Sequence, residues 1–246
     1  MIPVTVLVCA HNEEAYIGDC LDSVTAQTQI PALVIVVADR CTDRTEEIAR
    51  QKLSSVPSLI LEKDRSSWQN NISENLQMGL EKAKGVALVV VDADMVIPQR
   101  FLEALLSGLD SLAAVSALVR TDPSRGLLNR LVAAWELTYR FTPLGEQPRG
   151  GARAIATKPL RLVGGFRDVY AWESDLDTRL RKAGFKVKLD RNVSVLHRRK
   201  MTVARSVAYQ IQAGRARKEL HVSLLRTLLH SIVRLRPFVV VGYLSG

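Results

Sequence analysis

The sequence predicts an α/β protein with a mostly parallel central sheet and helices on both of its faces. Strand-like and helix-like patterns alternate through the first hundred residues, an order typical of parallel sheets covered by helices. The run from Val86 to Val91 is short, unbroken and largely β-branched, as expected of a strand buried on both faces.

Hydrophobic spacing and helix-end signals define the elements of the first half. Apolar Ile17, Leu21 and Val24 recur at helical spacing, Thr42 or Asp43 is a candidate N-cap, and Gly85 suits a helix C-terminus. In chain order we expect a strand over 4–9, a helix over 13–27, a strand over 33–38, a helix over 42–53, a strand over 58–62, a helix over 72–83 and a strand ending at Asp92.

The second half is less regular. Residues 143–153 are rich in Gly and Pro and predict a loop that acts as a lid or as part of the acceptor site. Around it we expect helices over 98–109, 127–141 and 173–183, strands over 113–118, 185–189 and 193–196, and two helices in the tail over 203–246.

Composition indicates an ordinary globular protein with acidic partners. Hydrophobic residues make up 47% and charged residues 24% of the chain, and its net charge is +9. The three cysteines have no metal-ligand spacing and favour a reducing compartment. The first strand pattern follows Met1 directly, and no stretch reaches the roughly 20 apolar residues that span a bilayer. We therefore expect a cytoplasmic protein without a signal peptide.

Two carboxylates stand at the end of the buried strand. Asp92 and Asp94 are one residue apart, so they repel each other and each costs free energy to desolvate. A divalent cation removes both costs, and hard oxygen ligands suit Mg²⁺ or Mn²⁺ shared with substrate phosphates. A solvated loop after a strand also explains two aspartates, so this pattern alone leaves both interpretations open.

The diphosphate of a nucleotide has no glycine-rich loop to bind here. Residues 9–14, after the first strand, contain no glycine, and the chain has no Gly-Lys-Ser/Thr loop. A metal at Asp92 and Asp94 is then the expected phosphate anchor. Ligands of parallel sheets bind beyond the carboxyl ends of the strands, so the polar residues that follow each strand should meet in one cleft.

Five motifs, in this order, resemble the successive signatures of family-2 glycosyltransferases, which have the GT-A fold. They are Ala10-His11-Asn12-Glu13-Glu14, residues 36–45, Asp92-Ala93-Asp94, Val163-Gly164-Gly165-Phe166 and Trp172-Glu173-Ser174-Asp175-Leu176, and the match continues through 179–187. The resemblance spans residues 2 to about 200. It implies a GT-A domain over 1–200, with a nucleotide-binding half over 1–95 and an acceptor half over 96–200, followed by a helical tail over 201–246.

The resemblance also implies roles for the donor-site residues. Asn12 and Glu13, with the backbone at Ala10, would edge the nucleotide pocket, and Asp39 would accept a hydrogen bond from the base. Asp92 and Ala93 would contact the nucleotide-sugar.

The same resemblance implies a metal cofactor, Mn²⁺ or Mg²⁺. Asp94 would bind it directly and Asp92 would contact it or the ribose. His197 is a candidate further ligand, although a lone histidine is more often structural. The metal would bridge the two donor phosphates and stabilise the departing nucleoside diphosphate.

The family's catalytic base lies in a Glu-Asp-x-Asp-Leu motif, which falls on residues 172–176. Trp172 replaces the first acid and Glu173 the catalytic Asp, so Glu173 is the expected base and Asp175 the second candidate. On a helix, Glu173 shares a face with Asp177, and acids also favour a helix N-terminus for electrostatic reasons. Gly150, Gly151 and Trp172 are the expected acceptor contacts.

These observations predict a metal-dependent, inverting glycosyltransferase that moves a sugar from a UDP- or GDP-sugar to a hydroxyl of a glycan or a lipid-linked acceptor. One alternative, motivated by Trp172, is a sugar-nucleotide-binding protein with a degraded base. Another is a nucleotidyltransferase of related fold, which the missing glycine-rich loop disfavours. Nucleic acid is not an expected partner, because the chain has no recognised nucleic-acid module.

The tail carries a basic amphipathic pattern. Residues 222–233 are apolar on one face with basic residues interleaved, and the apolar run 238–241 follows Arg234 and Arg236. Such a segment is typical of a peripheral anchor at an anionic membrane surface, here on the cytoplasmic side. Docking on the core or on a second subunit is the alternative.

Overall fold

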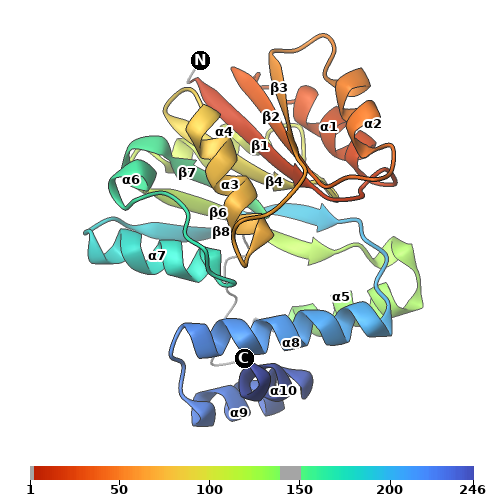
Figure 1. Ribbon diagram of the computed structural model, residues 1–246, viewed down its shortest axis with the longest axis vertical. Helices are drawn as coiled ribbons and strands as arrows, with labels where there is room; N and C mark the ends of the chain where they lie inside the picture. The colour runs from red at the N-terminus through yellow and green to blue at the C-terminus, as the bar shows by residue number, and fades with distance from the viewer. Residues whose placement is uncertain (1–2, 139–150) are drawn as a thin grey trace.

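One eight-stranded sheet organises this computed structural model, which describes residues 3–138 and 151–246 (Figure 1). The strand order is β3-β2-β1-β4-β7-β6-β8-β5. The strands are β1 (Val4–Ala10), β2 (Leu33–Asp39), β3 (Ser58–Lys63), β4 (Ala87–Asp92), β5 (Met95–Val96), β6 (Ala114–Thr121), β7 (Ala152–Ala156) and β8 (Val187–His197). The helices are α1 (Ile17–Thr25), α2 (Thr45–Lys52), α3 (Asn71–Lys82), α4 (Phe101–Gly108), the 3₁₀ turn η1 (Pro123–Arg125), α5 (Leu127–Leu137), α6 (Thr157–Leu162), α7 (Trp172–Lys182), α8 (Val203–Glu219), α9 (Leu224–Val233) and α10 (Phe238–Ser245).

The sheet is parallel in its first half and mixed in its second. Strand β1 pairs in parallel with β2 and β4, and β2 with β3. Strand β7 runs antiparallel to both β4 and β6, β5 runs antiparallel to β8, and β6 and β8 are parallel. The parallel half brings the carboxyl ends of β1, β2 and β4 to one edge, as the sequence predicted.

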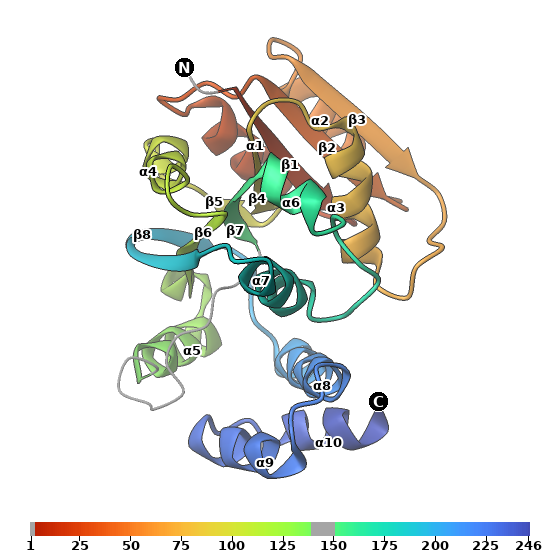
Figure 2. The same cartoon turned by 90° about the vertical axis from the view of Figure 1, so that its left-hand side faces the viewer.

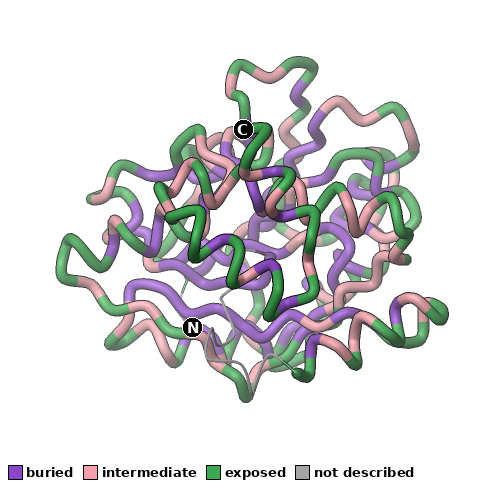
Figure 3. The backbone as a smooth tube through the Cα atoms, turned by 90° about the horizontal axis from the view of Figure 1, so that it is seen from below, coloured by how far each residue is buried: buried purple, intermediate pink, exposed green. Residues whose placement is uncertain are grey.

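Helices cover both faces of the sheet (Figure 2). Alternate residues of one strand enter different cores: Val6 and Val8 pack on the side of α1, α2 and α4, and Leu7 packs on the side of α3, α6 and α7. Viewed from below, the buried segments run through the middle and the exposed ones lie around them (Figure 3).

Strand β7 and helix α6 were not expected. The predicted loop over 143–153 falls largely on residues 139–150, which lie outside the described residues, as does the end of the predicted helix over 127–141. Ala152 and Arg153 already belong to β7. This strand escaped prediction because three alanines and a charged residue in its five positions have little β-propensity.

Other elements differ at their ends. Helix α1 begins at Ile17 rather than residue 13, because the Glu13 carbonyl first closes a turn with the N–H of Tyr16. Helix α2 begins at Thr45 with Arg44 in the N-cap position, while the Asp43 carboxylate accepts the Thr45 N–H at 3.0 Å. The two short strands expected over 185–196 are the single strand β8.

The tail forms three helices rather than two, and α8 and α10 touch through glycines. A Cβ on Gly214 would lie 2.1 Å from the Val239 carbonyl oxygen, and a Cβ on Gly242 would lie 2.0 Å from that of Ile211. The two helix backbones are therefore in direct contact. Helices α8, α9 and α10 lie at the same end of the molecule as α5 (Figures 1 and 2). None of the helices among the described residues has both the length and the apolar character that crossing a membrane requires.

Candidate functional site

The carboxyl ends of β1 and β4 bring the acidic segments together. In the sheet register Cys9 stands beside Asp92, so the residues that follow both strands emerge at the same edge. Strand β5 pairs Met95 with His197, which adds the end of β8 to this edge.

Glu13, Asp94, His197 and Arg199 form one connected cluster. Asp94 Oδ2 accepts a hydrogen bond from Arg199 Nε at 2.5 Å and lies 2.9 Å from His197 Nε2. The same guanidinium donates from Nη2 to Glu13 Oε1. Burial alone would raise the pKa of Asp94, but His197 and Arg199 hold that pKa below its usual value. Arg199 thus bridges two carboxylates from motifs far apart in the sequence.

Asp92 lies partly buried beside this cluster and against the main chain of Gly151. Its N–H donates to the Gly151 carbonyl at 2.8 Å, and a Cβ on Gly151 would lie 1.9 Å from Asp92 Oδ2. Burial, followed by the charges of Asp94 and Glu173, raises the pKa of Asp92 to about 7. Gly151, expected at the acceptor, is here the surface on which the Asp92 carboxylate rests, and Gly150 lies outside the described residues.

These donors fit a hard divalent cation. Two carboxylates and an imidazole are suitable ligands for Mn²⁺ or Mg²⁺. Glu13 Oε2 is buried and has no hydrogen-bond partner, so the cluster holds more negative charge than Arg199 satisfies. No group of three or more His, Cys, Asp or Glu side chains in the described part of the chain forms a complete metal site. A cation here would therefore need further ligands, such as phosphate oxygens or water.

Asp39, the expected base contact, already accepts several hydrogen bonds. Arg40 Nε donates to it at 2.7 Å and Asn75 Nδ2 at 3.0 Å, and Lys63 Nζ lies 3.6 Å away. Burial would raise the pKa of Asp39, but Arg40, Asn75 and Lys63 hold that pKa below its usual value. The ionised carboxylate is thus fixed at the end of β2, and a base would have to share it with Arg40.

Ala10 and Asn12 shape the segment after β1. Ala10 is buried at the strand end, and Asn12 adopts a positive φ of 54°. The Asn12 side-chain oxygen accepts the Thr42 N–H at 2.8 Å, which ties this segment to the one after β2. The structure therefore gives Asn12 a role in holding the two loops together. Ala93, between the two aspartates, is buried.

The two candidate bases, Glu173 and Asp175, lie on different sides of helix α7. Glu173 lies close enough to Asp92 for its charge to raise the Asp92 pKa. Asp175 forms an ion pair with Arg179 on its own helix, 2.7 Å between Oδ2 and Nη2. Asp177, one turn after Glu173, forms a buried ion pair with Arg153 of β7. The Asp177 side of α7 thus packs on the sheet, and helical spacing puts Glu173 on the same side of the helix.

Trp172, also expected at the acceptor, is 6% exposed and packs edge-to-face on Phe166 with ring centroids 5.5 Å apart. In this structure it belongs to the core. Sequence analysis missed Arg199 and Arg153. Arg199 stands two residues after His197, on the same side of the chain, and that spacing was the available signal. Nothing in the sequence pattern marked Arg153.

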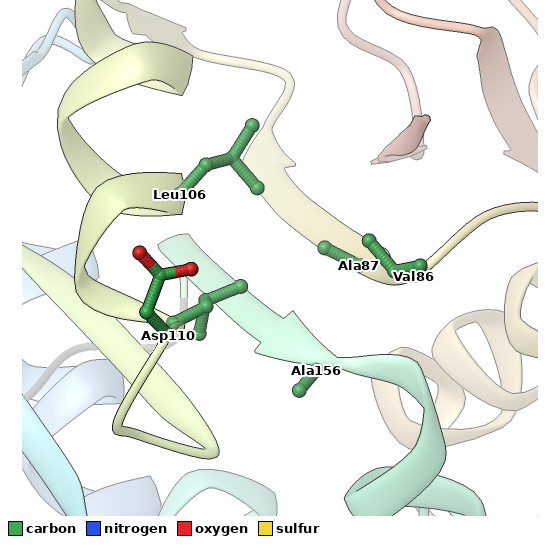
Figure 4. A pocket seen from close by; sticks show the side chains of 6 residues that line it. Val86, Ala87, Leu106, Asp110 and Ala156 are labelled. Atoms are coloured by element: carbon green, nitrogen blue, oxygen red, sulfur yellow. The ribbon is translucent and has the colours of Figure 1, made fainter. Parts of the chain in front are cut away.

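A small depression lies at the opposite end of β4 from Asp92 (Figure 4). Its volume is about 180 Å³, and Val86, Ala87, Leu106, Leu109 and Ala156 line it together with the carboxylate of Asp110. One acid among aliphatic side chains offers no catalytic grouping, unlike the cluster of acids at the Asp92 end.

A protein-family model matches most of the chain. The family model described as Glycosyl transferase family 2 matches residues 5–194.

Among curated proteins, glycosyltransferase GlyA of Streptococcus pneumoniae serotype 4 is 32% identical over 102 residues, which are 42% of this chain and 14% of that protein. The 4,4'-diaponeurosporenoate glycosyltransferase of Staphylococcus aureus (strain USA300) is 28% identical over 137 residues, 56% of this chain and 33% of that protein. The matches thus span a third or less of the length of these relatives.

Two solved structures are similar over most of the chain. Mannosyltransferase PcManGT from Pyrobaculum calidifontis, in complex with GDP-Man and Mn²⁺, has a TM-score of 0.69 at 23% identity and covers 99% of this chain and 70% of its own. Glucosyl-3-phosphoglycerate synthase from Mycobacterium tuberculosis, with Mn²⁺, UDP and glucosyl-3-phosphoglycerate, has a TM-score of 0.60 at 20% identity, covering 86% of this chain and 78% of its own. This likeness confirms the GT-A fold.

Proposed function

Because this chain belongs to glycosyl transferase family 2, we propose that it transfers a sugar from a UDP- or GDP-sugar to an acceptor hydroxyl, with Mn²⁺ or Mg²⁺ as cofactor. The observation that carries the proposal is the meeting of Asp92 and Asp94 with Glu13 and His197 at one edge of the sheet. The two solved structures named above hold GDP-Man with Mn²⁺ and UDP with Mn²⁺, which supports the assignment.

Asp94, Asp92 and His197 would hold the metal, whose chemistry is to stabilise charge on the leaving diphosphate. Glu13 contributes further negative charge at the same place. Asp39, kept ionised by its neighbours, would accept a hydrogen bond from the base, and Ala10, Asn12 and Ala93 would line the nucleotide path.

Glu173 would accept the proton of the attacking acceptor hydroxyl. Its charge acts on Asp92, which places it near the proposed metal site, and the carboxylate of Asp175 is held by Arg179 on its own helix. A base opposite the leaving diphosphate gives transfer with inversion at the anomeric carbon. Gly151, directly before β7, would border the acceptor side. We also propose the division that the sequence suggests, with a glycosyltransferase domain over 1–200 and a tail over 201–246.

Thermal unfolding tests the donor assignment. We would measure Tm with UDP-glucose, UDP-N-acetylglucosamine and GDP-mannose, in Mn²⁺ and in EDTA, for wild type and Asp94→Asn. A ligand at a hundredfold excess over Kd adds about 2.7 kcal/mol, a rise of roughly 5–10 °C for this chain length. Asp110→Asn, the same change at the far end of β4, is the control. Equal shifts in Asp94→Asn, or none with any donor, would contradict the proposal.

We also propose that the tail binds an anionic membrane surface, where a lipid-linked acceptor would lie. Helix α9 turns its polar side inward: Thr227 and Ser231 are buried against the tail, and Thr227 Oγ1 accepts from Arg217. Its apolar side is exposed, with Leu225 at 68% and Ile232 at 70%. An amphipathic helix that faces outward in this way is not docked on its own core.

Charge around this face favours a bilayer over a second protein subunit. Arg215 and Lys218 of α8 and Arg226 of α9 are exposed. Arginine and lysine on the same helical tail as an exposed apolar helix face attract anionic lipid headgroups. Helix α5, at the same end of the molecule, adds exposed Leu127 and Leu131.

Vesicle co-sedimentation tests this surface. We expect binding to vesicles that contain phosphatidylglycerol, little binding to pure phosphatidylcholine, and loss of binding in Leu225→Glu and Ile232→Glu. Leu162→Glu, an equally exposed leucine on α6, is the control. Sedimentation velocity on the same variants tests for a subunit contact. The membrane assignment is overturned if wild type forms dimers that Ile232→Glu dissociates and wild type does not bind vesicles.

A further inference from the structure

We propose that Arg199 is a built-in counter-cation of the metal site, which a divalent cation must displace from Asp94 in order to bind. Arg199 thereby lowers the affinity of the site for metal alone. The inference rests on the proposed function, in which Arg199 has no part in donor binding.

The contacts place Arg199 where the metal would act. Its Nε donates to Asp94 Oδ2, the same oxygen that lies 2.9 Å from His197 Nε2. One oxygen of Asp94 thus contacts both groups, so two of the proposed metal ligands, Asp94 and His197, are already engaged. A divalent cation at this oxygen would meet the guanidinium charge at close range, which is strongly repulsive in a partly buried site. Metal and guanidinium therefore exclude each other.

Arg199 is also required when the metal is absent. It contacts Glu13 as well as Asp94, and Asp92 lies beside them. Three acids gathered at one sheet edge repel each other, and a buried carboxylate without a counter-charge is costly. A single bridging guanidinium donates a charge-assisted hydrogen bond to each of two of them.

The main chain around Arg199 is held, so only its side chain needs to move. The Arg199 carbonyl accepts from Asn129 Nδ2 at 3.1 Å, and the Arg198 N–H donates to the Asp94 carbonyl at 2.8 Å. The guanidinium lies 5.4 Å from the ring centre of Tyr16, which favours a cation there. A change of side-chain rotamer can thus exchange cations without unfolding the strand end.

This arrangement predicts that metal and donor bind together. Because Arg199 acts as an internal competitor, the site is free to bind metal in only a fraction of the molecules. The apparent affinity for metal is the intrinsic affinity multiplied by that fraction. A donor diphosphate supplies new negative charge to the displaced guanidinium, so its binding favours the exchange. Metal alone should bind weakly, and metal with nucleotide much more tightly.

Titration with Mn²⁺ alone, followed by the electron paramagnetic resonance of free Mn²⁺, tests the proposal without any turnover. We expect Arg199→Gln to bind Mn²⁺ at least about tenfold more tightly than wild type, because a charge-assisted contact no longer competes. Arg199→Lys, a cation that cannot bridge both carboxylates, should lie between the two. The control is Arg198→Gln, which removes an equal charge from the neighbouring residue, paired instead with Asp122. It should leave the affinity within about twofold.

The outcomes separate this inference from the proposed function. Unchanged or weaker Mn²⁺ binding in both folded Arg199 variants overturns it, and the proposed function stands if Asp94→Asn abolishes Mn²⁺ binding in the presence of UDP or GDP. Absence of Mn²⁺ binding by every variant, with or without UDP or GDP, overturns both. If Arg199→Gln does not fold in EDTA, Arg199→Lys gives the same comparison.

Discussion

Glu219 of the tail helix α8 accepts a hydrogen bond of 2.8 Å at Oε2 from the backbone N–H of Tyr170, just ahead of helix α7. The same oxygen accepts from the N–H of Ala171 at 3.3 Å. Helix α7 has no side-chain cap of its own, so a carboxylate from the tail satisfies the chain at its start. The tail therefore helps to position the helix that carries Glu173.

Removal of this contact should slow transfer without affecting metal binding. Glu219→Ala leaves the two N–H groups without their acceptor, at a cost of about 1.5–3 kcal/mol for a charged hydrogen bond. We expect a several-fold loss of turnover with unchanged Mn²⁺ affinity. Glu219→Gln, which keeps an acceptor oxygen, should retain most of the activity. Equal losses in the two variants would contradict this role.

The ion pair between Arg153 and Asp177 should be expensive to break on one side only. Both side chains are buried, and Arg153 keeps two nitrogens without hydrogen-bond partners. Asp177→Ala should therefore destabilise the protein by about 3–5 kcal/mol in urea unfolding, since it leaves a buried guanidinium unpaired. The double variant Arg153→Met with Asp177→Leu should recover most of that loss. A single-variant cost below about 1 kcal/mol would show that the pair is hydrated rather than buried.

Gly151→Ala should disable the metal site without unfolding the protein. The added methyl group would meet the Asp92 carboxylate, which must move away. We expect the Mn²⁺-dependent rise in Tm with a nucleotide-sugar to disappear while far-ultraviolet circular dichroism stays the same. Gly18→Ala in α1 is the matched control, because its Cβ would make ordinary contacts at 3.6 Å. That helical change should stabilise the protein by about 0.5–1 kcal/mol.

Glu173 and Asp175 should differ sharply as bases. Loss of a general base typically slows a reaction about 10²–10⁴-fold, and we expect a loss in this range for Glu173→Gln. Asp175→Asn removes only the pair with Arg179 and should cost a few-fold at most. Donor binding, read from the Tm shift, should survive in both. A larger loss in Asp175→Asn would reassign the base.

Much of this arrangement could be predicted from the sequence because it depends on local patterns. The apolar runs of β1, β2 and β4 identify buried strands, and Asp92 and Asp94 follow at their carboxyl ends. Spacing on a helix placed Glu173 and Asp177 on one face, and helix α7 does span both residues.

The remaining features depend on contacts between distant segments. Arg199 meets Glu13 across 186 residues, and no periodicity encodes such a pair. Strand β7 can contain the charged Arg153 because Asp177 of α7 forms an ion pair with it. The five residues of the strand do not indicate that partner. The apolar stripe of α9 was evident, but a stripe does not indicate which way it faces. The structure turns Thr227 inward.

His230 of helix α9 should make the tail sensitive to acid. Burial, then the charges of Arg217, Arg236 and Arg234, lowers the pKa of His230 from 6.5 to about 4. Because the pKa in the folded tail is lower than in the unfolded chain, the unfolded chain binds more protons between these values. The stability that the neutral imidazole contributes is complete above about pH 6.5 and is lost as the pH falls toward 4.

Hydrogen exchange of α9 at pH 7.5 and at pH 5, corrected for the intrinsic exchange rate, measures this loss. We expect protection to fall at pH 5 in wild type and to change little in His230→Gln, which carries no titrating group. His221→Asn replaces an exposed histidine of the same tail at a positive φ that asparagine tolerates, and should behave like wild type. Anionic lipid would neutralise the surrounding arginines and allow His230 to take up its proton. Binding to phosphatidylglycerol vesicles should therefore strengthen from pH 7.5 to pH 5.5 in wild type more than in His230→Gln, and an equal gain in both would exclude this histidine as the source.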